Sequence, residues 1–287
     1  MGNIHGNRVV FDRLTRRGSH YVATHGGDFM KARDPWFRPV TVACGPDGGV
    51  FVSDWNDYGE CHDTDGSYRD SGRLYKITWG KPGPMSPFDL GKKSDAELVE
   101  LLAHRNDWWA RHARRSLQER AAAGNLDSRT EGALRRMLAE SPNTPQQLRA
   151  LWALHSIRRA DDATLAQLLN HPSEHLRWWA VMLLVEDHRA PNKVLNNLAE
   201  TARRDASAFV RLGIASALQR LPVTDRWPIA AALTAHAEDA DDAWLPLMIW
   251  YGIEPAVALD SARAAAFLTT CPFPTVRQLI ARRLAEE

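Results

Sequence analysis

Several oxygen and imidazole side chains gather in a short segment between residues 54 and 65. Carboxylates are the ligands that a hard cation such as Ca²⁺ prefers, and an imidazole can serve as a ligand or as a general base. Because the segment has no EF-hand spacing or other rigid metal pattern, we favour the alternative of a polar loop whose Asp side chains cap turns. The candidate metal ligands are Asp54, Asp57, Glu60, His62 and Asp63.

His5 and Arg8 form a second candidate group near the N-terminus. An arginine beside a histidine can orient an anionic or carbonyl group, so both join His62 as candidate catalytic residues. We favour the alternative that His5 and Arg8 lie on an exposed end of the protein.

The cysteines argue against a covalently bound cofactor. Cys44, Cys61 and Cys271 are an odd number at wide spacing, which gives neither a disulfide framework nor a zinc knuckle. Cys61-His62 is similar to the end of a c-type haem attachment motif, but Tyr58 stands where that motif needs its other cysteine. We expect no covalent c-type haem and no other cofactor in this chain, and calcium is the candidate ion.

Two tryptophan pairs, Trp108-Trp109 and Trp178-Trp179, raise the question of nucleic-acid binding. Adjacent helical residues point about 100° apart, so we expect one member of each pair in the core. The 36 basic and 35 acidic residues leave no global positive field, and we expect no nucleic-acid partner. Five arginine doublets are predicted at solvated helix ends: Arg114-Arg115, Arg135-Arg136, Arg158-Arg159, Arg203-Arg204 and Arg282-Arg283.

The first eighty residues have the alternation and turn residues of β-strands. Residues 40–44 and 50–55 flank an Asp-Gly pair, which predicts a hairpin. Residues 72–79 are a third strand, with Tyr75, Ile77 and Trp79 on one face. A weaker pair of strands is predicted over residues 8–14 and 19–24. Residues 81–93, with three prolines among the first seven, are predicted to be a linker.

After the linker the apolar period becomes helical. Ser94 and Glu97 form a predicted capping box at the start of a helix. An apolar residue followed by arginine then returns at intervals of 28, 34 and 66 residues, the last being about two units. Such periods indicate stacked helix pairs, each too small to bury its apolar face alone. The arginines of this pattern are Arg149, Arg177, Arg211 and Arg277.

These repeats resemble HEAT repeats. The fold class expected is therefore mostly α, a HEAT-like α-solenoid over residues 94–287 preceded by a small β-rich segment over residues 1–80. We count about five to six helix pairs. The longest apolar runs are shorter than the roughly 20 residues of a membrane span, so we expect no transmembrane segment.

The β-rich segment carries a more specific resemblance. Residues 34–40 (DPWFRPV), 45–55 (GPDGGVFVSDW), 59–63 (GECHD) and 72–77 (GRLYKI) resemble the last blade of the membrane-bound dehydrogenase-like propellers of planctomycetes and their relatives. In that family a sugar-dehydrogenase-like propeller precedes HEAT repeats and often a cytochrome c domain. His5 and Arg8 also resemble family residues near the propeller face. The resemblance implies export to the periplasm, although the N-terminal residues do not form a signal peptide.

The departures from the family shape the functional hypotheses. Residues 1–93 supply one to one and a half blades, fewer than a propeller needs, so we interpret the chain as a fragment or truncated product. Our leading hypothesis is a non-catalytic scaffold that acts on a protein partner or on the missing blades. One alternative is the C-terminal part of an active sugar or alcohol dehydrogenase. Another is a HEAT-like nucleic-acid-binding protein. The substrate, the partner and the compartment stay open.

Overall fold

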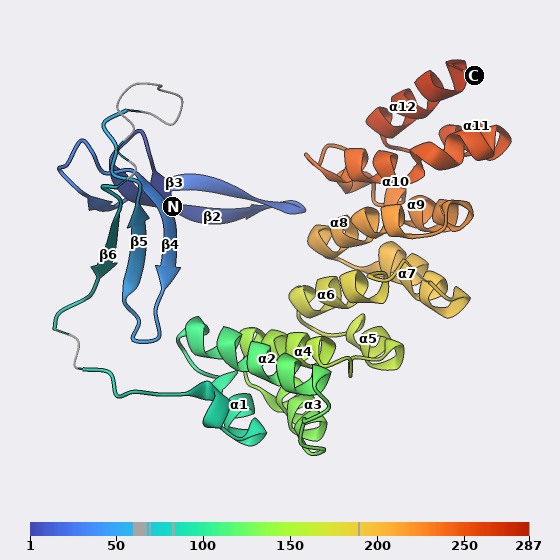
Figure 1. Cartoon of the computed structure of the whole chain (residues 1–287). Coiled ribbons are helices and arrows are strands. Elements are labelled where there is room, and N and C mark those ends of the chain that lie inside the picture. The colour runs from blue at the N-terminus through green and yellow to red at the C-terminus, as the bar shows by residue number, and fades with distance from the viewer. Residues whose placement is uncertain (60–67, 69, 82–83, 189, 287) are drawn as a thin grey trace. The chain divides into compact units, whose positions relative to one another are not determined.

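A computed structural model describes residues 1–59, 68, 70–81, 84–188 and 190–286. In these residues the chain forms two small antiparallel sheets followed by twelve α-helices (Figure 1), which confirms the mostly helical prediction. No strand follows Ile77 among the described residues, and the helices begin close to Ser94 as predicted. None of the helices in this part of the chain is long and apolar enough to cross a membrane.

Each sheet has three strands, paired in sequence order. In the second sheet Val52 is central, opposite both Val42 and Tyr75. Within the described residues neither sheet has the four strands of a propeller blade, so the blade assignment stays a prediction. Trp79, expected on the last strand, lies beyond it and is fully exposed. The strands are β1 (Gly2–Asn3), β2 (Arg8–Arg17), β3 (His20–Lys31), β4 (Pro39–Cys44), β5 (Val50–Asp54) and β6 (Arg73–Ile77).

The predicted hairpin between β4 and β5 is confirmed. The Gly45 N–H donates to the Gly49 carbonyl at 2.7 Å, and the Gly48 N–H donates to the Gly45 carbonyl at 3.0 Å. Gly48 has a φ of 83°, a conformation that glycine adopts without steric cost. The Asp47 carboxylate accepts from the Gly49 N–H at 3.1 Å and closes the turn.

The core of the β-rich segment is small. Val9, Phe37 and Val52 are buried together, and four partly buried residues pack against them: Met30, Ala32, Val50 and Ile77. Other apolar side chains of the segment remain exposed, among them Val40, Trp55, Leu74 and Tyr75. The sheets therefore bury little of the apolar surface that their strands carry.

The capping box at Ser94 is also confirmed. The Ser94 hydroxyl accepts from the Glu97 N–H, and the Glu97 carboxylate accepts from the Ser94 N–H at 2.8 Å. The next residue, Asp95, is buried and accepts from the Arg120 guanidinium at 2.5 Å and from the Asp127 N–H at 2.7 Å. The Thr130 hydroxyl also donates to Asp95 at 3.2 Å, so Asp95 ties together the first three helices, α1 (Asp95–Leu101), α2 (Asp107–Ala122) and α3 (Thr130–Glu140).

The later helices pack in two alternating rows. In one row α4, α6, α8, α10 and α12 contact one another in succession, and in the other α5, α7 and α9 do the same (Figure 1). The helices are α4 (Thr144–Ser156), α5 (Asp162–Leu168), α6 (Glu174–Leu184), α7 (Asn192–Arg204), α8 (Ala208–Ala217), α9 (Arg226–Thr234), α10 (Leu245–Leu259), α11 (Ser261–Thr270) and α12 (Pro274–Ala285).

The chain divides into two compact units. The first contains residues 1–15 and 22–136, and the second contains residues 16–21 and 137–287. Within the second unit the Ser19 hydroxyl and N–H donate to the Asp242 carboxylate, at 2.6 and 2.9 Å. The change from strands to helices falls at the predicted linker, whereas the unit boundary falls within α3. The domain division predicted from the sequence stays a prediction.

Candidate functional site

The Asp54 carboxylate is engaged within the protein. It is buried, and Oδ1 accepts from the backbone N–H groups of Arg38 at 2.7 Å and Asn56 at 2.9 Å. Oδ2 accepts from Nε of Arg73 at 2.7 Å. Asp54 therefore joins the ends of β4, β5 and β6 and fixes the turn after β5.

Asp57 has a similar turn-forming position. Its carboxylate accepts from the Gly59 N–H at 3.3 Å and from Nε1 of Trp55 at 3.2 Å. The other predicted ligands, Glu60, His62 and Asp63, lie outside the described residues. Among the residues that are described, no three His, Cys, Asp or Glu side chains are grouped so that they could hold a metal ion. The calcium site stays a prediction.

His5 lies in the first turn, and Arg8 follows that turn directly. His5 is exposed between β1 and β2, and Arg8 opens β2 and is half-buried. The Arg8 guanidinium lies 3.3 Å from the Asp28 carboxylate on β3. A hydrogen bond from Lys31, aided by the charge of Arg8, lowers the pKa of Asp28 from its ordinary value. Arg8 thus pairs with a structural carboxylate of the neighbouring strand.

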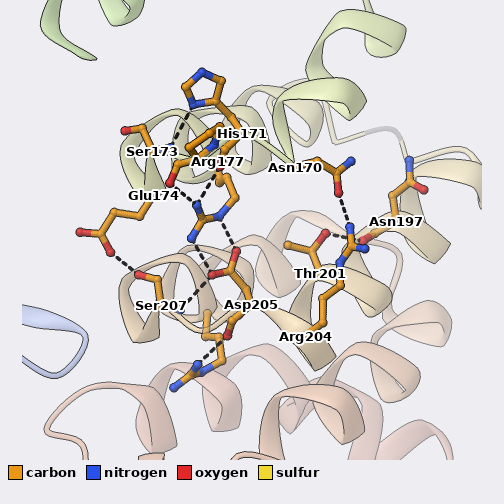
Figure 2. A network of polar contacts seen from close by, with 12 residues as sticks. Asn170, His171, Ser173, Glu174, Arg177, Asn197, Thr201, Arg204, Asp205 and Ser207 are labelled. Atoms are coloured by element: carbon orange, nitrogen blue, oxygen red, sulfur yellow. Dashed lines mark hydrogen bonds and ion pairs between the residues drawn. The ribbon is translucent and has the colours of Figure 1, made fainter. Parts of the chain in front are cut away.

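An arginine pairs with a buried aspartate in the second unit, where Arg177 contacts Asp205 (Figure 2), and the same contact recurs further along the chain. On α6, Arg177 makes a two-pronged pair with Asp205, with distances of 2.7 Å from Nε to Oδ2 and 2.9 Å from the terminal nitrogen to Oδ1. On α8, Arg211 pairs in the same way with Asp239, at 2.5 and 2.7 Å. Each pair spans 28 residues, and the two arginines are 34 residues apart.

The backbone contacts of the two arginines repeat as well. Arg177 donates to the carbonyl of His171 at 2.8 Å, and Arg211 donates to the carbonyl of Asp205 at 2.6 Å, in each case six residues before the arginine. Asp205 therefore accepts hydrogen bonds from Arg177 at its carboxylate and from Arg211 at its backbone carbonyl. The contacts form a continuous polar ladder from α6 past α8, and we name Arg177, Asp205, Arg211 and Asp239 the Arg–Asp ladder.

His171 opens this network. Its Nδ1 accepts from the Ser173 N–H at 3.1 Å, as the Asp205 carboxylate accepts from the Ser207 N–H at 2.9 Å (Figure 2). Burial, together with the positive charge of Arg177, lowers the pKa of His171 below its ordinary value of 6.5. The structure therefore favours a neutral imidazole that accepts a hydrogen bond ahead of α6.

The tryptophan pairs differ from the prediction. Trp108, Trp109, Trp178 and Trp179 are all half-buried, so the expectation that one of each pair packs in the core is wrong. Each ring packs instead against neighbouring aromatic side chains that leave part of it exposed, such as Phe88 beside Trp108 and Trp109. Trp178 stacks on Phe209 at 5.4 Å.

The doublet prediction is also wrong in part. Arg114-Arg115 and Arg135-Arg136 lie inside α2 and α3 and not at helix ends. In α2 the doublet shares one helix face with Arg111, because residues three or four apart are neighbours on a helix surface. The spacing of Arg111, Arg114 and Arg115 in the sequence could have predicted that they share one helix face.

Sequence reasoning identified the arginines of the ladder but not their partners. Arg177 and Arg211 were recognised as markers of the repeat, whereas Asp205 and Asp239 were not singled out. The signal was available, because each aspartate follows its arginine by 28 residues. Long-range pairs of this kind become visible only when the repeat is laid out in register.

Comparison with known proteins covers part of the chain. Residues 3–78 match the sequence profile of a family described as a domain of unknown function, DUF7133. No curated protein matches the chain. The crystal structure of an engineered protein is similar over 66% of this chain and 97% of that chain, with 16% identity and a TM-score of 0.35, which is too low to support an argument about fold or function.

Proposed function

We propose that this chain is a non-catalytic scaffold, in which a HEAT-like stack of helix pairs follows a β-rich segment similar to the last blade of a dehydrogenase-like propeller. The Arg–Asp ladder is the observation that carries the proposal. The same residue types make the same side-chain and backbone contacts 34 residues apart, which supports a repeating structural unit. Repeat stacks commonly present extended surfaces to partners.

The packing of the helices supports the same interpretation. The alternating rows, α4 to α12 and α5 to α9, are what a stack of helix pairs would produce, since each unit contacts only its neighbours. Among the described residues, helix contacts join the two members of five consecutive pairs, α1–α2, α5–α6, α7–α8, α9–α10 and α11–α12, which supports the proposed stack of helix pairs. A stack of this kind offers surface for binding without needing a closed active site.

The β-rich segment supports a binding role. Its exposed apolar side chains include Val40, Trp55, Leu74 and Tyr75, and exposed apolar surface commonly marks a protein contact. The described carboxylates of the predicted loop, Asp54 and Asp57, bond to the protein's own N–H groups. We propose that this segment binds a protein partner or the blades that would complete a propeller.

Turnover measurements test the non-catalytic role. The purified chain, given sugar or alcohol substrates and a quinone or dye acceptor, is expected to show no turnover above a buffer blank, because catalysis needs groups that converge from several parts of a closed site. The control is the His62→Ala variant measured in parallel. Turnover that disappears in this variant would establish the dehydrogenase alternative in place of the scaffold.

A further inference from the structure

A cleft of about 520 Å³ lies between β4 and α2 in the first unit. On the β4 side it is lined by three consecutive residues, Val42, Ala43 and Cys44. Successive side chains of a strand point to opposite faces of the sheet, and a cleft that runs along the edge of the strand meets all three residues in turn. The open edge of β4 therefore borders the cleft, in keeping with its place at the end of its sheet (Figure 1).

The backbone of this edge has unused hydrogen-bonding capacity. In the β4–β5 ladder Gly45 and Gly49 form a hydrogen-bonded pair, and Ala43 and Phe51 are opposite each other two positions further along. Ala43 and Phe51 therefore also occupy a hydrogen-bonded position. Because bonded and non-bonded pairs alternate, the N–H and C=O groups of Val42 and Cys44 point away from β5. Within the described residues no strand other than β5 pairs with this stretch, and Gly2 of β1 lies against the Pro39 carbonyl at the other end of β4.

The opposite wall of the cleft is positively charged. One face of α2 contributes Arg111, His112, Arg114 and Arg115, against a single carboxylate from Asp107. Arg111 lies 3.9 Å from Asp107, and Arg115 lies 2.8 Å from Glu119. In both pairs the two residues are one helical turn apart and exposed, so each pair contributes little to the stability of the protein. Either arginine can therefore leave its helical carboxylate and bind a carboxylate of a ligand instead.

The two walls are held together by fixed contacts. The Asn106 amide donates to the carbonyls of Gly45 at 2.8 Å and Pro46 at 3.1 Å. Nε1 of Trp109 also donates to the Pro46 carbonyl, at 2.9 Å. These bonds fasten the β4–β5 turn to the first turn of α2. They set the strand edge and the arginines in a constant register before any ligand arrives.

We propose that this cleft binds an extended acidic peptide segment of a partner protein, which adds to β4 as a further strand. Its main chain bonds to Val42 and Cys44, and its carboxylates meet Arg111 and Arg115. A nucleic acid would satisfy the arginines, but its backbone has no N–H and C=O groups to match the strand edge. The inference rests on the proposed scaffold function and deepens it by naming the chemistry of the partner.

Fluorescence anisotropy with the full chain tests this proposal. The probe is an acetylated, fluorescein-labelled octapeptide in which Glu alternates with Thr. Two matched peptides accompany it, one with Lys in place of every Glu and one with alternate amides N-methylated. We expect the Glu peptide to bind, with affinity that falls as salt is raised. We expect the other two to bind at least about tenfold more weakly, the first through repulsion and the second through lost backbone bonds.

Protein variants locate the site. The double variant Arg111→Gln, Arg115→Gln is expected to weaken binding of the Glu peptide at least about tenfold. The matched control is Arg282→Gln on α12. Arg282 forms the same kind of exposed pair, 3.1 Å from Glu286, and its loss is expected to leave binding unchanged.

Several results would overturn the proposal. These are an absence of binding at millimolar peptide, equal binding of the N-methylated peptide, and equal binding by the double variant. A single-stranded oligonucleotide that binds more tightly than the Glu peptide and loses affinity in the double variant would assign the cleft to nucleic acid. None of these results involves dehydrogenase turnover, so each is distinguishable from failure of the scaffold function.

Discussion

The β-rich segment and the later helices differ in how completely they bury their apolar side chains. In the β-rich segment three residues form the buried cluster, while Val40, Trp55 and Leu74 remain exposed. In the helices each row covers the next, and the fully buried side chains include Leu151, Leu176, Leu198, Ile214 and Leu218. In a stack of helices the apolar face of each helix is covered by the next helix of the same chain. A sheet with open faces and edges leaves its apolar side chains exposed unless another protein or domain covers them.

The comparison also separates two uses of arginine. The ladder arginines lie inside the helical rows, where Arg211 is 4% exposed and Asp239 is 6% exposed. The arginines of the cleft are largely in water, with Arg115 73% exposed. The same side chain therefore contributes to stability in one region and is available for a partner in the other.

The largest expected effect comes from breaking the ladder. Arg211→Ala leaves the Asp239 carboxylate buried without its partner, which costs about 3–5 kcal/mol of unfolding free energy. Urea denaturation followed by circular dichroism measures this loss. Arg115→Ala is the matched control at an exposed pair, with an expected cost of about 0–1 kcal/mol. Equal losses in the two variants would show that the ladder does not hold the helices together.

A comparable loss is expected from truncating the core of the β-rich segment. Phe37→Ala removes the largest side chain of a small cluster, and deletions of this kind cost about 3–5 kcal/mol. Hydrogen exchange is expected to show faster exchange in β4 and β5 and unchanged exchange in α8 and α10.

Phe273→Ala is the matched variant for the helices, since Phe273 is fully buried ahead of α12. We expect it to accelerate exchange in α10 and α12 and to leave the strands unchanged. If either variant loosens both regions equally, the two regions fold as one cooperative unit and the contrast between them is wrong.

Local patterns predicted the elements well. The Asp47-Gly48 turn and the Ser94–Glu97 capping box each depend on residues within a few positions of one another, and both are confirmed. The weaker strand pair was also placed correctly, although β2 and β3 extend to Arg17 and Lys31, beyond the predicted ends at 14 and 24. Alternation weakens near a turn, so strand ends are harder to define than strand existence.

The sites were harder to predict because they depend on distant residues. Asp54 was proposed as a metal ligand, but its position beside Arg73 and the Arg38 backbone follows from the pairing of three strands. The cleft of β4 and α2 joins residues more than sixty positions apart through Asn106 and the Gly45 carbonyl. No local spacing in the sequence encodes that contact.

A third prediction concerns association. Residues 94–287 alone are expected to stay monomeric and to be more soluble than the full chain, because the exposed side chains of the strands are absent. The full chain is expected to self-associate or to require a partner. Static light scattering at equal concentrations compares the two. A monomeric full chain beside an aggregating helical fragment would overturn the interpretation of residues 1–93 as an incomplete blade.

The smallest expected effect is a pH dependence from His171. Its pKa is lowered in the folded protein by burial and by Arg177, so near and below pH 6.5 the unfolded chain binds more protons than the folded chain. The contribution of His171 is therefore complete above pH 6.5 and is lost as the pH falls through the lower folded value. The lowered carboxylates, such as Glu97 with a pKa of about 2, act in a separate and more acidic range.

His171→Asn tests this assignment, because an asparagine oxygen can accept the Ser173 N–H and does not titrate. An asparagine makes a contact of the same two-residue spacing where Asn106 Oδ1 accepts from the Trp108 N–H at 3.0 Å. Unfolding free energy measured by urea denaturation from pH 7.5 to 5 should decline less in the variant than in the parent chain. Parallel slopes for the parent and His171→Asn would show that the imidazole is not held neutral by the ladder.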